Sequence, residues 1–419
     1  MPYLKMLASL SIPCVVALIA TAFSDNPGAP NPDIETRPKI MAHYMPWYAA
    51  KPISGHWGWH WTMNHFNPEK IDKTGKREIA SQYYPLIGPY DSCDPDVLEY
   101  HVLLMKLAGI DGIIVDWYGI EDFYDYAVLN RNTSRVIEYA KKAGLEFAIC
   151  YEDQAIKHMV NENRIGEDDA IRHGQKVMRY LQEKWFGDSL YLKLESRPVL
   201  LNFGPQYFAE SPQWDSLFSV LDICPQFFTV NHRLFPSAIG AFPWPPMWKA
   251  QDGVLTEESC DDYLDQFYQN SSDWDFVIGG AFPGFHDVYE EAGTRSSYGY
   301  LDAKMGYTLI HTFQKAIANH ANIVQVVTWN DFGEGTNIEP TEEYGYRYLE
   351  IIQDLKKNID PRFSYRNEDL TLPRQLYDLR KKYGNDKEVM SKLDEVFTLL
   401  LSGKLAGAKK VMAELCSSS

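Results

Sequence analysis

The chain has 419 residues, enough for one large domain or two ordinary ones with a sizeable core. Its formal net charge is −17 and no basic patch is evident, which excludes a nucleic-acid partner because nothing would neutralise the phosphates. Aromatic residues make up 14% of the chain and often stand beside His, Asn, Asp and Gly in short polar stretches, where packing alone explains them poorly.

The first 39 residues predict an exported protein. Residues 1–22 contain one early lysine, an apolar run over 7–19 and the small-residue end Ala20-Thr21-Ala22, the pattern of a cleavable signal peptide. The apolar run is too short for a comfortable span, so we expect no stable membrane insertion after cleavage. Residues 23–39, rich in Pro, Asn and Asp, are predicted to be a linker. The expected location is secreted or periplasmic.

The sequence predicts neither a metal nor a cofactor. Five cysteines follow the signal, at positions 93, 150, 224, 260 and 416, and their odd number and wide spacing give no disulfide framework and no zinc pattern. His56, His60 and His65 have helix-like spacing in an unhelical, Gly-rich stretch, which favours metal binding only weakly.

Apolar strands alternate with amphipathic helices along residues 40–358, which predicts parallel βα units. The connectors Ala108-Gly109-Ile110-Asp111 and Ala143-Gly144-Leu145-Glu146 are the same helix-to-strand link used twice. The predicted strands are 40–44, 112–115, 147–150, 198–203, 227–230, 239–242, 276–280 and 323–327, and the helices between them include 95–108, 133–143, 168–185, 213–221, 257–268 and 300–319. Eight strands with polar C-terminal ends predict a (β/α)8 TIM barrel. A doubly wound open sheet is the alternative, but no Gly-rich turn follows the first strand.

Beyond the barrel, residues 342–357 are predicted to be the closing helix. Segments 372–383, 387–401 and 404–415 have helical spacing with charged faces, so residues 359–419 are expected to form a small, structural C-terminal helical appendage on a monomer.

Polar and aromatic side chains follow the predicted strands, and a barrel would gather them in one pit at its C-terminal face. The predicted binding residues are His43, Tyr44, Trp47 and Tyr48 after the first strand, Asp116, Trp117 and Tyr118 after the second, Glu152 after the third, Asn202 after the fourth, and Trp329 and Asn330 after the eighth. Trp57 and Trp59 join them from the long loop 55–89, because long loops in a compact domain are usually functional. Flat aromatic faces suit sugar rings, so the expected partner is an oligo- or polysaccharide.

Asp331 and Glu334 are the predicted catalytic pair. Carboxylates, amides and aromatics without a Cys or Ser nucleophile favour glycoside hydrolysis, in which one acid protonates the leaving oxygen and one carboxylate acts as base or nucleophile. The plain alternative is a turn capped by Asn330 and Asp331.

Other residues also have structural alternatives. Asp116 could cap a backbone segment, Glu152 could be a paired surface acid, and His43 could be a satisfied core histidine. The alternating Trp57, Trp59 and Trp61 could be the packed face of an ordinary strand.

These motifs resemble two known families. Thr328-Trp329-Asn330-Asp331-Phe332-Gly333-Glu334 is similar to the signature of glycoside hydrolase family 71, the α-1,3-glucanases, as is Ala42-His43-Tyr44-Met45. Glu334-Gly335-Thr336-Asn337-Ile338-Glu339-Pro340 and Tyr44-Met45-Pro46-Trp47-Tyr48 resemble family 99, the endo-α-1,2-mannosidases and mannanases. The resemblance implies a (β/α)8 fold acting on α-mannan or α-glucan, with Asp331 and Glu334 catalytic and Glu152 in the active site.

One position departs from this pattern. Family 99 has Glu where this chain has Asp331, and its retaining mechanism uses the longer side chain as a base on the sugar's own 2-hydroxyl. We therefore assign Glu334 as general acid and Asp331 as base and leave retention or inversion open. A non-catalytic glycan-binding barrel and an exo-acting xylosidase or arabinosidase are the rival functions.

Overall fold

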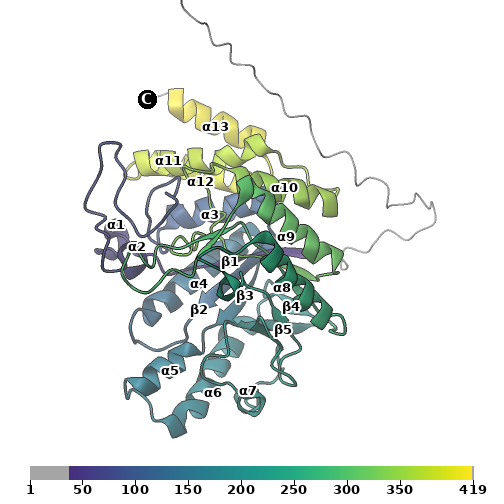
Figure 1. The fold of residues 1–419 in the computed structure, drawn as a ribbon. Coiled ribbons are helices and arrows are strands. Elements are labelled where there is room, and N and C mark those ends of the chain that lie inside the picture. The colour runs from purple at the N-terminus through teal and green to yellow at the C-terminus, as the bar shows by residue number, and fades with distance from the viewer. Residues whose placement is uncertain (1–36, 418–419) are drawn as a thin grey trace, which may run out of the picture. The chain divides into compact units, whose positions relative to one another are not determined.

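Eight parallel strands form a nearly closed barrel in the computed structural model, which describes residues 37–417 (Figure 1). The predicted signal peptide and all but the end of the predicted linker lie outside these residues. The strands are β1 (Lys39–Tyr44), β2 (Gly112–Trp117), β3 (Glu146–Tyr151), β5 (Arg197–Asn202), β6 (Gln226–Val230), β7 (Gly240–Phe242), β8 (Ile278–Ala281) and β11 (Ile323–Val326). Their order is β7-β6-β5-β3-β2-β1-β11-β8. The first strand pairs with the last, β11, which confirms the barrel and removes the doubly wound alternative.

Three short strands lie outside this path. β4 (Lys193–Leu194) pairs antiparallel with β5, and β9 (Phe285–His286) pairs with β10 (Tyr300–Leu301) in a separate two-stranded sheet. β9 belongs to the loop that follows β8, close to the site described below.

The helices follow their local signals. In α3 (Pro95–Ala108), the Asp94 side chain accepts the Asp96 N–H at 3.0 Å, and the helix ends at Gly109 with a φ of 84°. A Cβ at Gly109 would lie 2.6 Å from Cγ of Lys356, so glycine is needed there for space as well as conformation. The other helices are α1 (Lys51–Ser54), α2 (Trp59–Thr62), α4 (Tyr126–Ala143), α5 (Gln154–Asn161), α6 (Ala170–Leu181), α7 (Ser211–Phe218), α8 (Glu257–Asn270), α9 (Tyr307–Ala318) and α10 (Arg347–Ile359).

Helix boundaries differ most from the sequence prediction at the starts of α4 and α9, and α10 begins at Arg347 rather than at residue 342. α4 begins at Tyr126 rather than near residue 133, because Tyr126 and Leu129 are buried and extend its apolar face by two turns. α9 begins only at Tyr307, because residues 300–301 pair as β10 and residues 304–306 form a separate 3₁₀ turn.

The barrel strands are buried on both faces. Alternate side chains of each strand point into the barrel interior and toward the surrounding helices. All six residues of β2 are buried. Trp117 stacks on Tyr180 and meets Trp185 edge-on, so it faces the helices. Its neighbour Asp116 therefore points into the barrel. This alternation decides which predicted residues reach the site.

The C-terminal helices α11 (Leu372–Tyr383), α12 (Lys387–Leu401) and α13 (Leu405–Ser417) agree with the predicted segments (Figure 1). They dock on α3 through charged side chains as well as apolar ones. Arg380, 4% exposed, places its Nε 2.6 Å from Glu99 and an Nη 2.9 Å from Asp394. Lys381 reaches Asp94 at 2.7 Å. The appendage therefore covers an outer helix of the barrel, and Tyr377 of α11 packs on the buried cluster that contains Tyr48 and Phe332. No helix within residues 37–417 is long and apolar enough to cross a membrane.

Replacing Arg380 with alanine should loosen this docking. Burial raises the pKa of Glu99 to about 7 even though Arg380 opposes the shift, so removing the guanidinium leaves a buried acid without its cation. We expect unfolding in urea to become easier by about 3 kcal/mol. Arg362→Ala, on an exposed side chain, should leave unfolding in urea nearly unchanged. Equal effects of the two substitutions would show that the Arg380 contacts do not anchor the appendage.

Candidate active site

Four carboxylic acids gather at the C-terminal ends of neighbouring strands. Asp116 lies near the end of β2, Glu152 follows β3, and Asp331 and Glu334 follow β11. Asp116, Glu152 and Asp331 are 2%, 4% and 5% exposed. Burial raises the pKa values of Asp116, Glu152 and Glu334 most. The charge of Asp331 adds to the shifts of Asp116 and Glu334, and the charges of Asp116 and Glu334 add to that of Glu152, so the four groups lie within electrostatic reach of one another.

The loop after β11 is held by hydrogen bonds within the loop and to β9. The N–H of Asp331 donates to Oγ1 of Thr328 at 2.7 Å, and Oδ1 of Asp331 accepts the N–H of Glu334 at 3.0 Å. The N–H of His286 donates to the carbonyl of Glu334 at 2.8 Å. Gly335 has a φ of 63°, and a Cβ there would lie 2.5 Å from the His286 carbonyl oxygen. The two acids are thus presented by a loop that tolerates little change.

The environments of Asp331 and Glu334 differ. Burial raises the pKa of Asp331 to about 6, while the amides of Glu334 and Gly333 stabilise its charged form. Burial and the nearby Asp331 raise the pKa of Glu334 well above its usual range. Glu334 therefore keeps its proton to higher pH than Asp331, and the pair holds one acid and one base over a common pH window.

Two aromatic residues beside Glu334 were not predicted. The hydroxyl of Tyr289 lies 3.5 Å from Oε1 of Glu334, and Trp244 lowers the pKa of Glu334 through a side-chain hydrogen bond. Oε2 of Glu334 is buried without a hydrogen-bond partner among the described residues. Trp244 follows β7 and Tyr289 follows β8, two of the three strand ends, with β6, from which the sequence analysis drew no candidate. The signal that could have indicated Trp244 was Phe242-Pro243-Trp244, in which an aromatic residue stands just past the end of a predicted strand.

Glu152 accepts a hydrogen bond from Nε2 of Gln154 at 2.8 Å. Burial, followed by the charge of Asp116, raises its pKa well above the usual value. The folded chain therefore binds a proton that the unfolded chain releases above pH of about 4. The contribution of protonated Glu152 to the free energy of unfolding is therefore complete below that pH, and it is lost as the pH rises through the folded pKa of this acid.

Glu152→Gln should therefore stabilise the protein at high pH and leave it unchanged in acid. We expect a thermal midpoint higher by about 2 °C at pH 8 and unaltered near pH 4, measured by calorimetry. Glu258→Gln, on the exposed side of α8, should shift neither value. A fall in the midpoint at pH 8 would mean that the Glu152 carboxylate is ionised and stabilised in the folded protein.

Several predicted binding residues serve the protein's own framework. Asn330 donates from Nδ2 to the Met45 carbonyl and to the Tyr90 hydroxyl, both at 3.0 Å, and its Oδ1 accepts the Met45 N–H at 2.8 Å. The Tyr48 hydroxyl donates to the Asn330 carbonyl at 2.8 Å. Asn330 thus ties the loop after β11 to the loop after β1, and its place in a sugar site stays a prediction.

A second buried network lies next to this tie. Nδ1 of His101 lies 3.0 Å from the Tyr44 hydroxyl, and Nε2 lies 3.2 Å from Glu339, with both His101 and Glu339 side chains fully buried. The Tyr90 hydroxyl donates to Glu339 at 2.7 Å, and Trp329 packs edge-on against His101. Tyr44 and Trp329 therefore face α3 rather than the barrel interior.

The remaining predicted residues fall into two groups. Tyr118 borders the acids, because Glu152 and Asp116 raise its pKa, and His43 points into the barrel and meets Trp244 edge-on. Trp47 stacks on His60, Trp57 donates to Glu69, Trp59 is 41% exposed, Trp117 packs under the helices, and Asn202 donates to the Tyr151 carbonyl. Substrate contact by these residues stays a prediction.

The barrel and its cluster of acids define the class: a (β/α)8 protein built like the glycoside hydrolases. The model of glycosyl hydrolase family 99 matches residues 37–222. That match contains the residues after β1, Asp116 and Glu152 but ends before Asp331 and Glu334. The matches support the family 99 side of the predicted resemblance and bring no support for family 71.

The relatives are similar over part of the chain. The glycoprotein endo-alpha-1,2-mannosidase-like protein of Mus musculus is 33% identical over 100 residues, 22% of each chain. The glycoprotein endo-alpha-1,2-mannosidase of Mus musculus is 34% identical over 88 residues, 19% of each chain. The chain thus aligns with about a fifth of the length of these curated relatives.

Two solved structures share the fold. The GH99 endo-alpha-mannosidase from Bacteroides thetaiotaomicron, in complex with BIS-TRIS-propane, superposes with a TM-score of 0.57 at 17% identity and covers 76% of this chain and 96% of its own. A glycoside hydrolase-like protein superposes with a TM-score of 0.52 at 14% identity, and the superposition covers 78% of this chain and 96% of that protein's chain.

Proposed function

We propose that this protein is a family 99-type glycoside hydrolase that cleaves α-mannosidic bonds within glycan chains. The observation that carries the proposal is the asymmetry between Asp331 and Glu334. A buried and a partly buried acid on one fixed loop have different proton affinities, as acid and base catalysis of glycoside hydrolysis requires. The family 99 match and the relatives named for endo-alpha-1,2-mannosidase activity support an α-mannosidic substrate.

In the proposed reaction, Glu334 gives its proton to the glycosidic oxygen as the C–O bond breaks. Asp331 accepts a proton by one of two routes: from a water whose oxygen bonds to the anomeric carbon, or from the 2-hydroxyl of the sugar being cleaved. In the second route the 2-oxygen bonds to the anomeric carbon, and a water then opens the ring so formed. Both routes need Asp331 ionised and Glu334 protonated when the substrate binds. They differ in the anomer released first.

A substrate panel tests the proposal. Linear and branched α-mannans, defined α-1,2-mannosides, α-1,3-glucan and aryl α-xylosides would be incubated with the full chain, with product size followed by chromatography and the first anomer by NMR. We expect oligosaccharide products from α-mannan. Release of single sugars only would favour the exo-acting alternative, and cleavage of α-1,3-glucan alone would overturn the mannoside assignment. Binding of a glycan without any product would favour a glycan-binding barrel.

We also propose that the protein is exported by its predicted signal peptide and acts as a monomer. N-terminal sequencing of protein recovered from medium or periplasm, with light scattering of the same sample, tests both points. An intact residue 1 in the exported protein would exclude cleavage.

A further inference from the structure

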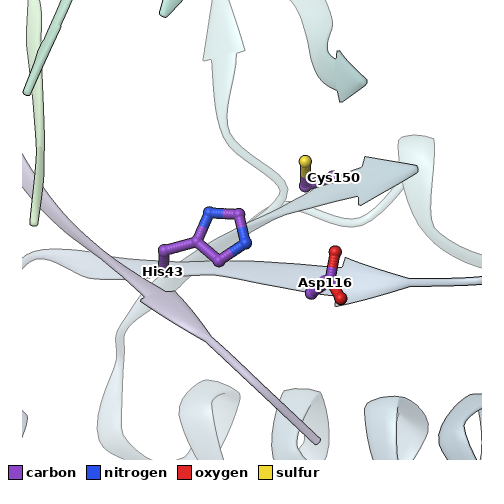
Figure 2. Close-up of side chains that lie close together, drawn as sticks. All are labelled: His43, Asp116 and Cys150. Atoms are coloured by element: carbon purple, nitrogen blue, oxygen red, sulfur yellow. The ribbon is translucent and has the colours of Figure 1, made fainter. Parts of the chain in front are cut away.

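Three side chains of different chemistry meet inside the barrel next to the carboxylate cluster. His43 comes from β1, Asp116 from β2 and Cys150 from β3, three strands that lie side by side (Figure 2). Asp116 and Cys150 are direct partners in the β2–β3 register. One nitrogen, one carboxylate oxygen and the sulfur lie within 4.8 Å of one another, and all three residues are at most 2% exposed.

Packing does not account for these groups. Gln325 lies near enough to His43, and Tyr118 near enough to Asp116, for a side-chain hydrogen bond to affect the pKa of each. By strict geometry, however, neither ring nitrogen of His43 has a hydrogen-bond partner among the described residues, and Oδ1 of Asp116 has none either. Gln325, on the neighbouring β11, also has both amide atoms buried without partners. Buried polar atoms are nearly always satisfied in folded proteins, so several orphaned atoms at one place indicate a bound species that completes their contacts.

The donor set identifies the chemistry of that species. An imidazole nitrogen, a thiolate and a carboxylate are together the ligands of zinc and similar borderline cations, whereas magnesium and calcium prefer oxygen alone. Three protein ligands leave a fourth position of a tetrahedron for water or the Gln325 side chain.

A divalent cation at this place would take the position of the protons that a buried carboxyl and a buried thiol otherwise carry. We propose that His43, Asp116 and Cys150 bind one zinc-class divalent cation inside the barrel. The sequence analysis expected no metal, because these three residues lie far apart in the chain and form no ligand spacing.

A second cluster supplies a matched control. Glu257 and Asp261 of α8 and His311 of α9 also bring ligand atoms within 4.8 Å of one another. These acids already have cations: Lys304 pairs with Glu257, and Lys315 lies 3.2 Å from Asp261. We therefore expect this second cluster to remain metal-free.

The test uses the full chain, stripped with a chelator, dialysed against zinc or cobalt(II), and freed of unbound metal. We expect about one equivalent of metal per chain by mass spectrometry, and a thiolate-to-cobalt absorption band in the near ultraviolet. Cys150→Ser should abolish the band and lower metal retention by about tenfold or more. Cys260→Ser, at an equally buried thiol, and His311→Ala should keep both signals.

Asp116→Asn serves as the second variant, because it nearly preserves the side-chain shape should Cys150→Ser fail to fold. Metal retention lowered by about tenfold or more in a folded Asp116→Asn protein supports the site. Wild-type protein that retains no metal, retention unchanged in both variants, or a cobalt derivative without the thiolate band overturns it. None of these signals depends on glycan cleavage, so failure of this site and failure of the proposed function are distinguishable.

Discussion

Glu334→Gln is expected to lower kcat on α-mannan by about 10²- to 10⁴-fold, because it removes the proton that the leaving oxygen receives. The glutamine has nearly the same shape and still allows the backbone contacts of the loop after β11. Glycosides with a strongly acidic leaving group, such as dinitrophenol, need little protonation. For these glycosides, the rate constant of bond cleavage in Glu334→Gln should therefore fall by no more than about tenfold.

This dependence on the leaving group separates catalysis from structure. A variant that only disturbed the site would lose activity on all substrates alike. Glu258→Gln, exposed on α8, should match wild type on every substrate. An equal loss with polysaccharide and dinitrophenyl glycoside would remove Glu334 from the general-acid role.

The sequence predicted the barrel because its signals repeat. The helix-to-strand connector that contains Gly109 recurs around Gly144, and both glycines adopt left-handed backbone conformations in the structure. Asp331 and Glu334 were also predicted to lie together, because two residues three positions apart on one short loop cannot lie far from each other. Local rules therefore reached the architecture and the proximity of the two acids, whose catalytic roles stay a prediction.

Side-chain direction was beyond those rules. Strands buried on both faces are apolar throughout, so the sequence carries no alternation to show which residue points into the barrel. His43 and Asp116 point inward, whereas Tyr44 and Trp117 point to the helices. Asn330 looked like a sugar ligand because amides bind hydroxyls, but its contacts to Met45 and Tyr90 join segments that are distant in sequence.

Asp331→Asn should abolish the acidic limb of the pH–rate profile. In the wild type, activity requires Asp331 ionised, so kcat/KM should fall as the pH drops below about 6, the raised pKa of this buried acid. Glu334 must be protonated, and its still higher pKa sets the alkaline limb. Asparagine cannot accept the proton. We expect a loss of about 10²- to 10⁴-fold and a residual rate that no longer falls near pH 6.

Asp331→Glu is the informative companion, because it keeps a carboxylate and introduces the glutamate that the family 99 pattern in the predicted resemblance has at this position. It should exceed Asp331→Asn in activity by about tenfold or more and keep an acidic limb. Asp354→Asn, exposed on α10, should leave the profile unchanged. If Asp331→Asn keeps the acidic limb, the base is a different acid of the cluster. Asp116 and Glu152 then become the candidates, because the charge of Asp331 affects the pKa of Asp116 and the charge of Glu334 affects that of Glu152.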